Sequence, residues 1–157
     1  MISGIAYGVV LNDERQLREL GIRLNDAPYL GAPQAPVMFI KPRTCFRFHG
    51  AAIPMPDELE RVEAAATLGS LFERDVTKAK PANALSGVAA ACLAIEVCEP
   101  HDAFHRPAIR QRCRDGFLPL GAFTAFEPAF AAADIPTVID GRRRHTWSLS
   151  DLAFFFF

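Results

Sequence analysis

Closely spaced prolines limit how long any helix in this chain can be. Four of its 12 prolines lie at positions 28, 33, 36 and 42. Proline fixes the backbone φ angle and lacks the N–H group that an internal helical residue donates, so this stretch is excluded from helix. Its apolar centre, VMFI at 37–40, therefore predicts a short buried strand.

Apolar runs elsewhere predict further strands. Residues 4–12 (GIAYGVVLN) and 87–98 (GVAAACLAIEVC) are apolar enough for buried strands. Residues 136–147 (PTVIDGRRRHTW) predict a β-hairpin with an exposed arginine-rich tip, because the central Asp-Gly pair suits a tight turn. Residues 58–76 stay open between helix and strand. Alanine and glutamate favour helix there, whereas TLGSLF with its internal glycine suits a strand.

Helices are expected only as short segments. Residues 14–24 (ERQLRELGIRL) are amphipathic, and Lys80-Pro81 places a proline where a first helical turn accepts it. Residues 148–153 (SLSDLA) resemble a helix start capped by Ser148 or Ser150. The last four residues are phenylalanines, which either are buried in an interface or mark an abrupt break in the reading frame. We favour the break.

Composition and charge exclude several classes of protein. Hydrophobic residues make up 50% of the chain and charged residues 22%, which excludes global disorder. The 17 basic and 18 acidic residues leave a formal charge of −1, so no excess field steers the chain to nucleic acid or an anionic membrane. No apolar run is long enough for a membrane span, and no basic residue precedes the first apolar stretch as in a signal peptide. We therefore expect a soluble cytoplasmic protein.

The four cysteines form no metal or redox motif. They lie at Cys45, Cys92, Cys98 and Cys113, and no two of them have C-x-x-C spacing. A zinc knuckle or a thioredoxin-like site is therefore not supported. In a chain without a secretory signal, we expect reduced and mostly buried thiols.

Residues 100–121 (PHDAFHRPAIRQRCRDGFLPLG) are the most distinctive segment. Together with FIKPR at 39–43 and the proline-bounded AAIPMP at 51–56, they resemble the fumarylacetoacetate hydrolase superfamily. Within it, the likeness is greatest to the bifunctional isomerase/decarboxylases of 4-hydroxyphenylacetate (homoprotocatechuate) breakdown, and specifically to their N-terminal half. The resemblance runs from about residue 4 to residue 152 and includes the hairpin segment VIDGRRRHTWS.

The resemblance implies a fold and a division of the chain. The fold is a β-rich α+β structure, the mixed β-roll of the superfamily, which dimerises in the family. Residues 1–55 would form a small N-terminal β region and residues 56–157 an incomplete β-roll, together one structural unit. Because family members continue into a further helix and a glycine-rich segment, the likeness also implies truncation at the C-terminus.

The resemblance further implies a divalent-metal site, of which this chain keeps little. In the family, Mg²⁺ or Mn²⁺ is held by an E-x-E pair on one strand and by an Asp from a later strand, and it chelates the oxo-acid unit of the substrate. Ala65 and Thr67 stand at the E-x-E positions, so both of those carboxylates are lost. Glu96 replaces the Asp and is the only surviving ligand position. We therefore expect this chain alone to bind no metal.

Glu96 and Arg112 are the candidate catalytic residues, and Arg106 and Arg110 the candidate substrate-binding residues. Arg112 stands where the family has a lysine, but a guanidinium does not release its proton near neutral pH. The arginine cluster formed by Arg106, Arg110, Arg112 and Arg114 suits a di- or tricarboxylic acid, because guanidinium groups bind carboxylates with two parallel hydrogen bonds. Alternatively, the cluster is a solvated face and Glu96 pairs with a nearby arginine, since a lone buried charge is costly.

Two other groups of side chains contain residue types that bind metal ions. His101 and His105 have the spacing that would place both imidazoles on one helix face, but flanking prolines argue against a helix, and we expect surface or hydrogen-bonded histidines. Glu60 and Glu63 precede the lost E-x-E positions, and we expect them on the surface.

Two functions of different class remain open. The first is half or a subunit of a metal-dependent isomerase/decarboxylase that acts on 2-oxo or 2-hydroxy dienoate di- or tricarboxylic acids, with the metal held by a homologous subunit or C-terminal half. The second is a non-catalytic scaffold that dimerises with a metal-bearing homologue. Both exclude nucleic acid and membrane partners.

Overall fold

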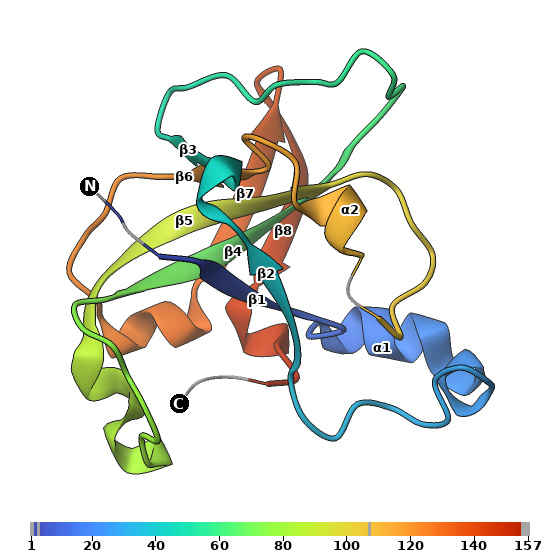
Figure 1. Cartoon of the computed structure of the whole chain (residues 1–157), viewed down its shortest axis with the longest axis horizontal. Coiled ribbons are helices and arrows are strands. Elements are labelled where there is room, and N and C mark those ends of the chain that lie inside the picture. The colour runs from blue at the N-terminus through green and yellow to red at the C-terminus, as the bar shows by residue number, and fades with distance from the viewer. Residues whose placement is uncertain (1, 3, 107, 155–157) are drawn as a thin grey trace.

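The computed structural model describes residues 2, 4–106 and 108–154, which form three sheets with a few short helices around them (Figure 1). The strands are β1 (Ala6–Val10), β2 (Val37–Lys41), β3 (Phe46–Phe48), β4 (Glu63–Phe72), β5 (Val88–Cys98), β6 (Leu118–Leu120), β7 (Asp134–Ile139) and β8 (Arg142–Ser148). The α-helices are α1 (Glu14–Leu20) and α2 (Ile109–Arg112), and 3₁₀ turns cover Gly21–Asn25, Arg43–Cys45, Pro81–Gly87, Pro128–Ala132 and Leu149–Asp151.

The largest sheet is mixed and has the strand order β3-β6-β5-β4. β3 runs parallel to β6, whereas β6 with β5 and β5 with β4 are antiparallel. The expected β-rich α+β fold is thus confirmed. The segment 58–76, open between helix and strand in the sequence, contains β4, because pairing along the whole of β5 outweighs the helix preference of its alanines.

The antiparallel pair β1–β2 lies across one face of this sheet (Figure 1). β2 alternates: Phe39 and Lys41 are buried, whereas Met38 and Ile40 are exposed. Because successive side chains of a strand point to opposite faces, the last inward position of β2 is occupied by a lysine. The strand predicted at 37–40 is confirmed, with this buried lysine as its end.

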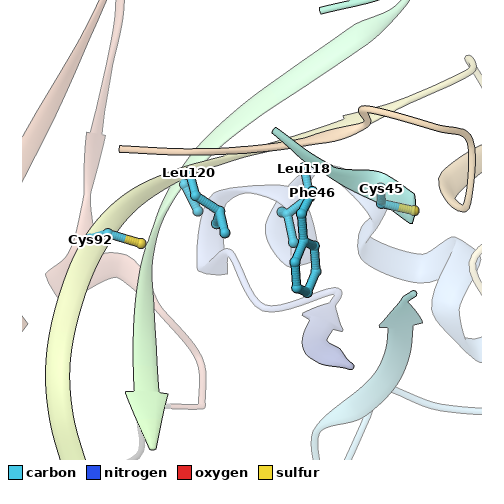
Figure 2. Packing of buried hydrophobic residues seen from close by; sticks show 6 residues of the cluster. Cys45, Phe46, Cys92, Leu118 and Leu120 are labelled. Carbon is cyan, nitrogen blue, oxygen red and sulfur yellow. The ribbon is translucent and has the colours of Figure 1, made fainter. Parts of the chain in front are cut away.

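A compact apolar cluster lies under the mixed sheet. Its buried members come from β3, β5, β6 and the turn before β3: Cys45, Phe46, Cys92, Ala94, Leu118 and Leu120. In Figure 2 the side chains of Phe46 and Leu120 project from the same side of the sheet. Ala6 of β1 packs against the cluster, so the β1–β2 pair is held onto the sheet by apolar contacts.

The β7–β8 hairpin has the predicted turn. Asp140 and Gly141 both have positive φ, 52° and 71°, as a tight two-residue hairpin turn requires. Arg142, Arg143 and Arg144 after the turn are exposed, as expected.

The expected helix at 148–153 was wrong. The segment forms only a 3₁₀ turn, Leu149–Asp151, and no side chain caps it. The Ser148 hydroxyl instead donates a hydrogen bond to Asp134 Oδ1 at 2.7 Å, on the neighbouring strand. Likewise, the helix start expected at Lys80-Pro81 is a 3₁₀ turn, Pro81–Gly87.

Residues near the two ends of the described chain lie together. The Asn12 side chain donates to the Phe154 carbonyl at 3.1 Å and accepts from the Phe154 N–H at 2.7 Å.

Of the phenylalanines at the end of the sequence, 155–157 lie outside the described residues. The boundary at residue 55 stays a prediction. None of the helices in the described part of the chain has the length and apolar character of a membrane span.

Candidate functional site

Glu96 lies between two buried cations. Lys41 Nζ is 2.8 Å from Glu96 Oε1, and Arg112 Nη1 is 2.8 Å from Glu96 Oε2. The side chains of Lys41, Arg112 and Glu96 are 1%, 8% and 14% exposed. The alternative in which Glu96 pairs with a nearby arginine is therefore what the structure shows, with a lysine added.

Three different elements bring these charges together. Glu96 lies near the end of β5, Lys41 at the end of β2, and Arg112 at the end of the short helix α2. The α2 turn begins with the hydrogen bond from the Arg112 N–H to the Ala108 carbonyl, at 3.0 Å. The ion cluster therefore joins the β1–β2 strand pair, the mixed sheet and the distinctive segment 100–121.

Lys41 donates all of its hydrogen bonds to backbone carbonyls. The acceptors are Val97, Arg112 and Phe117, at 2.6, 2.5 and 3.0 Å from Nζ. An ammonium group has three hydrogens, so none is left for Glu96 Oε1. Accordingly, Glu96 Oε1 has no hydrogen-bond partner among the described residues, although Nζ lies close to it. The attraction between Lys41 and Glu96 is that of two adjacent charges rather than of a directed hydrogen bond.

Arg112 is held by three groups at once. Besides Glu96, it donates from Nη2 to His101 Nε2 at 3.1 Å, and its guanidinium carbon lies 4.7 Å from the centre of the Phe39 ring. Because guanidinium only donates, His101 accepts at Nε2, and its Nδ1 then donates to the Ala103 carbonyl at 3.2 Å. His101 is thus the hydrogen-bonded histidine expected from the sequence, and residues 101–106 form no helix.

The side chains at this site do not fit a divalent metal. Ala65 is the direct cross-strand partner of Glu96, and Thr67 is the partner of Ala94, so the two positions that the resemblance assigns to metal ligands share the sheet face of Glu96 but carry no carboxylate. Glu96 itself is already neutralised by two cations. No group of three or more histidine, cysteine, aspartate or glutamate side chains able to hold a metal occurs among the described residues.

The remaining arginines of the cluster are dispersed. Arg106 and Arg110 are exposed, and their substrate-binding role stays a prediction. Arg114 pairs with Glu99 and, at 2.7 Å, with Glu58. The predicted four-arginine cluster therefore divides into one buried residue, one ion-paired residue and two exposed residues.

Other sequence predictions concern carboxylates and thiols. Glu60 and Glu63 are exposed, as expected. All four cysteines are free, and three of them, Cys45, Cys92 and Cys98, are buried. Burial and, as a smaller cause, the nearby Glu96 carboxylate together raise the pKa of the Cys98 thiol to about 11.

Sequence reasoning missed Lys41 as a site residue. The signal was present: this chain has only three lysines, and Lys41 ends an apolar strand immediately before a proline. A charged residue in an apolar strand is rarely buried unless it has a partner. A lysine at this position therefore predicts a partner elsewhere in the chain. Glu96 and Arg112, which were identified, are the residues that it meets.

Comparison with known proteins identifies the family. Residues 6–157 match the family described as "Fumarylacetoacetate (FAA) hydrolase C-terminal". The chain belongs to the fumarylacetoacetate hydrolase family. A curated relative, the 4-hydroxyphenylacetate degradation bifunctional isomerase/decarboxylase of Escherichia coli, is 34% identical over 96% of this chain. The protein of the same name from Salmonella dublin is equally similar, 34% identical over the same share.

This family member covers only part of those relatives. The chain spans 35% of the length of the E. coli and S. dublin proteins. Their activity as whole proteins is therefore not transferred to this chain by the match alone.

Solved structures of the family share the fold. The 5-carboxymethyl-2-hydroxymuconate delta-isomerase of Mycobacterium smegmatis superposes with a TM-score of 0.75 at 20% identity, over 97% of this chain and 58% of that one. The fumarylpyruvate hydrolase of Pseudomonas aeruginosa, solved in complex with Mn²⁺ and pyruvate, gives a TM-score of 0.72 at 17% identity, over 95% of this chain and 66% of that one. The fold is shared with a protein that holds a metal, whereas the side chains around Glu96 do not fit one.

Proposed function

We propose that this chain is one half or subunit of an isomerase/decarboxylase of 4-hydroxyphenylacetate catabolism. The proposed substrates are 2-oxo or 2-hydroxy dienoate di- or tricarboxylic acids. Support comes from the 34% identity with the bifunctional enzymes and from the part of their length, 35%, that this chain spans. We further propose that the catalytic metal is held by a homologous subunit or C-terminal half with an intact set of carboxylates.

The observation that carries the role of this half is the pairing of Glu96 with Lys41 and Arg112. A carboxylate that is neutralised on both oxygens is a poor ligand for a metal and a poor base for a proton. Separating Glu96 from both cations would leave buried charges without a partner, so the cluster resists opening. The half is accordingly proposed to act as the framework of the assembly, a non-catalytic scaffold that dimerises with the metal-bearing part.

A second candidate, contact with substrate, is favoured by the exposure of Arg106 and Arg110. Arg106 lies on the segment that leads into α2, and Arg110 lies within α2, two residues before the buried Arg112. Exposed guanidinium groups bind carboxylates by paired hydrogen bonds, as a tricarboxylic substrate would require. In this version the half adds binding energy for the substrate, while bond breaking takes place on the partner.

Reconstitution tests the proposal. The chain is assayed for release of CO₂ from the homoprotocatechuate ring-cleavage product, first alone with Mg²⁺ and then with a metal-bearing family member. We expect no turnover by the chain alone and turnover that rises with its concentration when the partner is present. Turnover by the chain alone, or a partner whose rate does not change when the chain is added, contradicts the proposal.

Two variants separate the scaffold from the substrate contact. In the reconstituted assembly, Arg110→Ala raises KM about tenfold or more if the guanidinium binds a substrate carboxylate. The matched control is Arg143→Ala, another exposed arginine, at the tip of the β7–β8 hairpin. Equal KM values for the two variants support the scaffold.

The four free thiols agree with the cytoplasm as the proposed compartment, because disulfides are rare there.

A further inference from the structure

The ammonium group of Lys41 lies inside a cage of four oxygen atoms. Three are backbone carbonyl oxygens at 2.6, 2.5 and 3.0 Å from Nζ, and the fourth is a carboxylate oxygen at 2.8 Å; they belong to Val97, Arg112, Phe117 and Glu96. The Lys41 side chain is 1% exposed. This burial shields the ammonium group from water.

These oxygens come from separate parts of the chain. Val97 belongs to β5, Arg112 ends α2, and Phe117 immediately precedes β6. The last carbonyls of a helix have no partner within the helix, so the Arg112 carbonyl needs a donor from elsewhere. Carbonyl and carboxylate oxygens that converge on one point carry negative charge and repel one another unless a cation lies between them. The local fold thus requires a positive charge at the centre of the cage.

We propose that this cage is a monovalent-cation site that the chain fills with its own ammonium group. The distances of 2.5–3.0 Å are those of ammonium hydrogen bonds, whereas Mg²⁺ requires oxygens at about 2.0–2.1 Å. Only one of the four oxygens belongs to a charged group, which suits a single positive charge. Arg112 beside Glu96 adds a second cation that would repel a divalent ion.

The inference concerns this chain alone and does not depend on the proposed function. It predicts that the four oxygens keep their arrangement once the lysine side chain is removed, and that the space between them is then unoccupied. Lys41→Ala deletes the part of the side chain that corresponds to propylammonium, so an added propylammonium ion can enter the same space. A neutral molecule of the same length, or a cation without N–H groups, lacks what the cage binds.

Chemical rescue is therefore the first experiment. We expect Lys41→Ala to lower the Tm by about 10 °C, as for other buried ion pairs that lose one partner. Propylammonium chloride is expected to restore at least half of that loss, whereas 1-propanol, tetramethylammonium chloride and MgCl₂ at matched ionic strength restore little. Lys78→Ala, at an exposed lysine, serves as the control and leaves the Tm unchanged. Equal effects of all four additives, or full rescue by MgCl₂, overturn the proposal.

A measurement on the unaltered protein applies even if Lys41→Ala does not fold. With ¹⁵N-labelled lysine, the NMR spectrum at neutral pH should contain one slowly exchanging ammonium signal, because only Lys41 is shielded from water and Lys78 and Lys80 are exposed. Scalar coupling from this nitrogen to backbone carbonyl carbons would identify the cage directly. Lys41→Arg should abolish the signal. A spectrum in which all three lysine ammonium groups exchange rapidly with water overturns the proposal, independently of any activity measurement.

Discussion

Ala65 and Glu96 are direct cross-strand partners in the antiparallel pair of β4 and β5. Their side chains therefore lie on the same face of the sheet, at the distance where a second carboxylate would share a cation with Glu96. The methyl group of Ala65 provides no such oxygen. Instead, Lys41 and Arg112 approach Glu96 from β2 and α2 and neutralise it.

Removing the charge of Glu96 should destabilise the fold strongly. Glu96→Gln leaves Lys41 and Arg112 buried without a counter-charge, and we expect a loss of about 3–5 kcal/mol in the free energy of unfolding. Urea denaturation measures it. Glu63→Gln is the matched control, because Glu63 is an exposed carboxylate of β4, and it should change stability by less than about 0.5 kcal/mol. A similar small effect for both variants would contradict the charge cluster as a structural centre.

Gly116, in the segment 100–121, lies where a neighbouring residue approaches the backbone too closely for a side chain. It has a φ of +77°, and a Cβ atom there would lie 2.5 Å from Pro54 Cδ. We expect Gly116→Ala to cost about 2–4 kcal/mol, from backbone strain and from the steric clash together. Gly141→Ala is the control that separates the two causes. Its φ is +71° with open space around it, so only the strain of about 1 kcal/mol should remain. Equal losses of stability in the two variants would show that the Pro54 contact is unimportant.

The start of α1 should contribute a pH-dependent stability. Asp13 caps the helix: burial opposes its ionisation, but hydrogen bonds from the Arg15 side chain and from the Gln16 and Arg15 N–H groups outweigh burial and lower the pKa of Asp13 below 3.8. A lowered pKa in the folded state stabilises above the unfolded-state pKa, and this stability disappears as the pH falls through the folded value.

Asp13→Asn keeps a capping side chain but removes the charge, so it isolates this effect. We expect the variant to be less stable than the original by up to about 1 kcal/mol at pH 6, and the difference to vanish at acidic pH below the pKa of Asp13. Thermal melts across this pH range test it. Asp57→Asn, at an exposed position, is the control. A difference that grows on acidification would contradict the direction of the Asp13 shift.

Cysteine labelling tests the environment beside Glu96. Burial and the Glu96 carboxylate raise the pKa of Cys98 to about 11, so little thiolate exists at pH 8. Cys113 is partly exposed, whereas the other three cysteines are buried. We expect iodoacetamide to modify Cys113 first and Cys98 only after unfolding in urea, as mass spectrometry of peptides would show. Fast modification of Cys98 in the native protein would mean that this part of the sheet is open.

The sequence predicted elements whose cause is local. The apolar run at 87–98 became β5, and the Asp-Gly pair at 140–141 became the hairpin turn, because burial and turn geometry are determined by adjacent residues. Segment 58–76 stayed ambiguous until its pairing with β5 was known. The helix expected after Ser148 failed because the hydroxyl that would cap it is bound to Asp134, a residue on another strand.

The candidate site was predictable only in part, for the same reason. Glu96 and Arg112 were found because a resemblance to a family marks positions along the chain. The partner of Glu96 on β2 was not found, because the carbonyls that hold Lys41 belong to residues 97, 112 and 117, far from it in sequence. A buried cation of this kind is defined by tertiary structure alone.

Titration of the chain with Mn²⁺, followed by electron paramagnetic resonance of the free ion, tests most directly whether Lys41 and Arg112 prevent Glu96 from binding divalent metals. The fumarylpyruvate hydrolase of P. aeruginosa, solved with Mn²⁺, is the positive control. The account predicts that millimolar Mn²⁺ gives the same free-ion signal with and without this chain, and that Glu96→Gln changes nothing. Loss of the free-ion signal in the presence of the chain, reversed by Glu96→Gln, would contradict it.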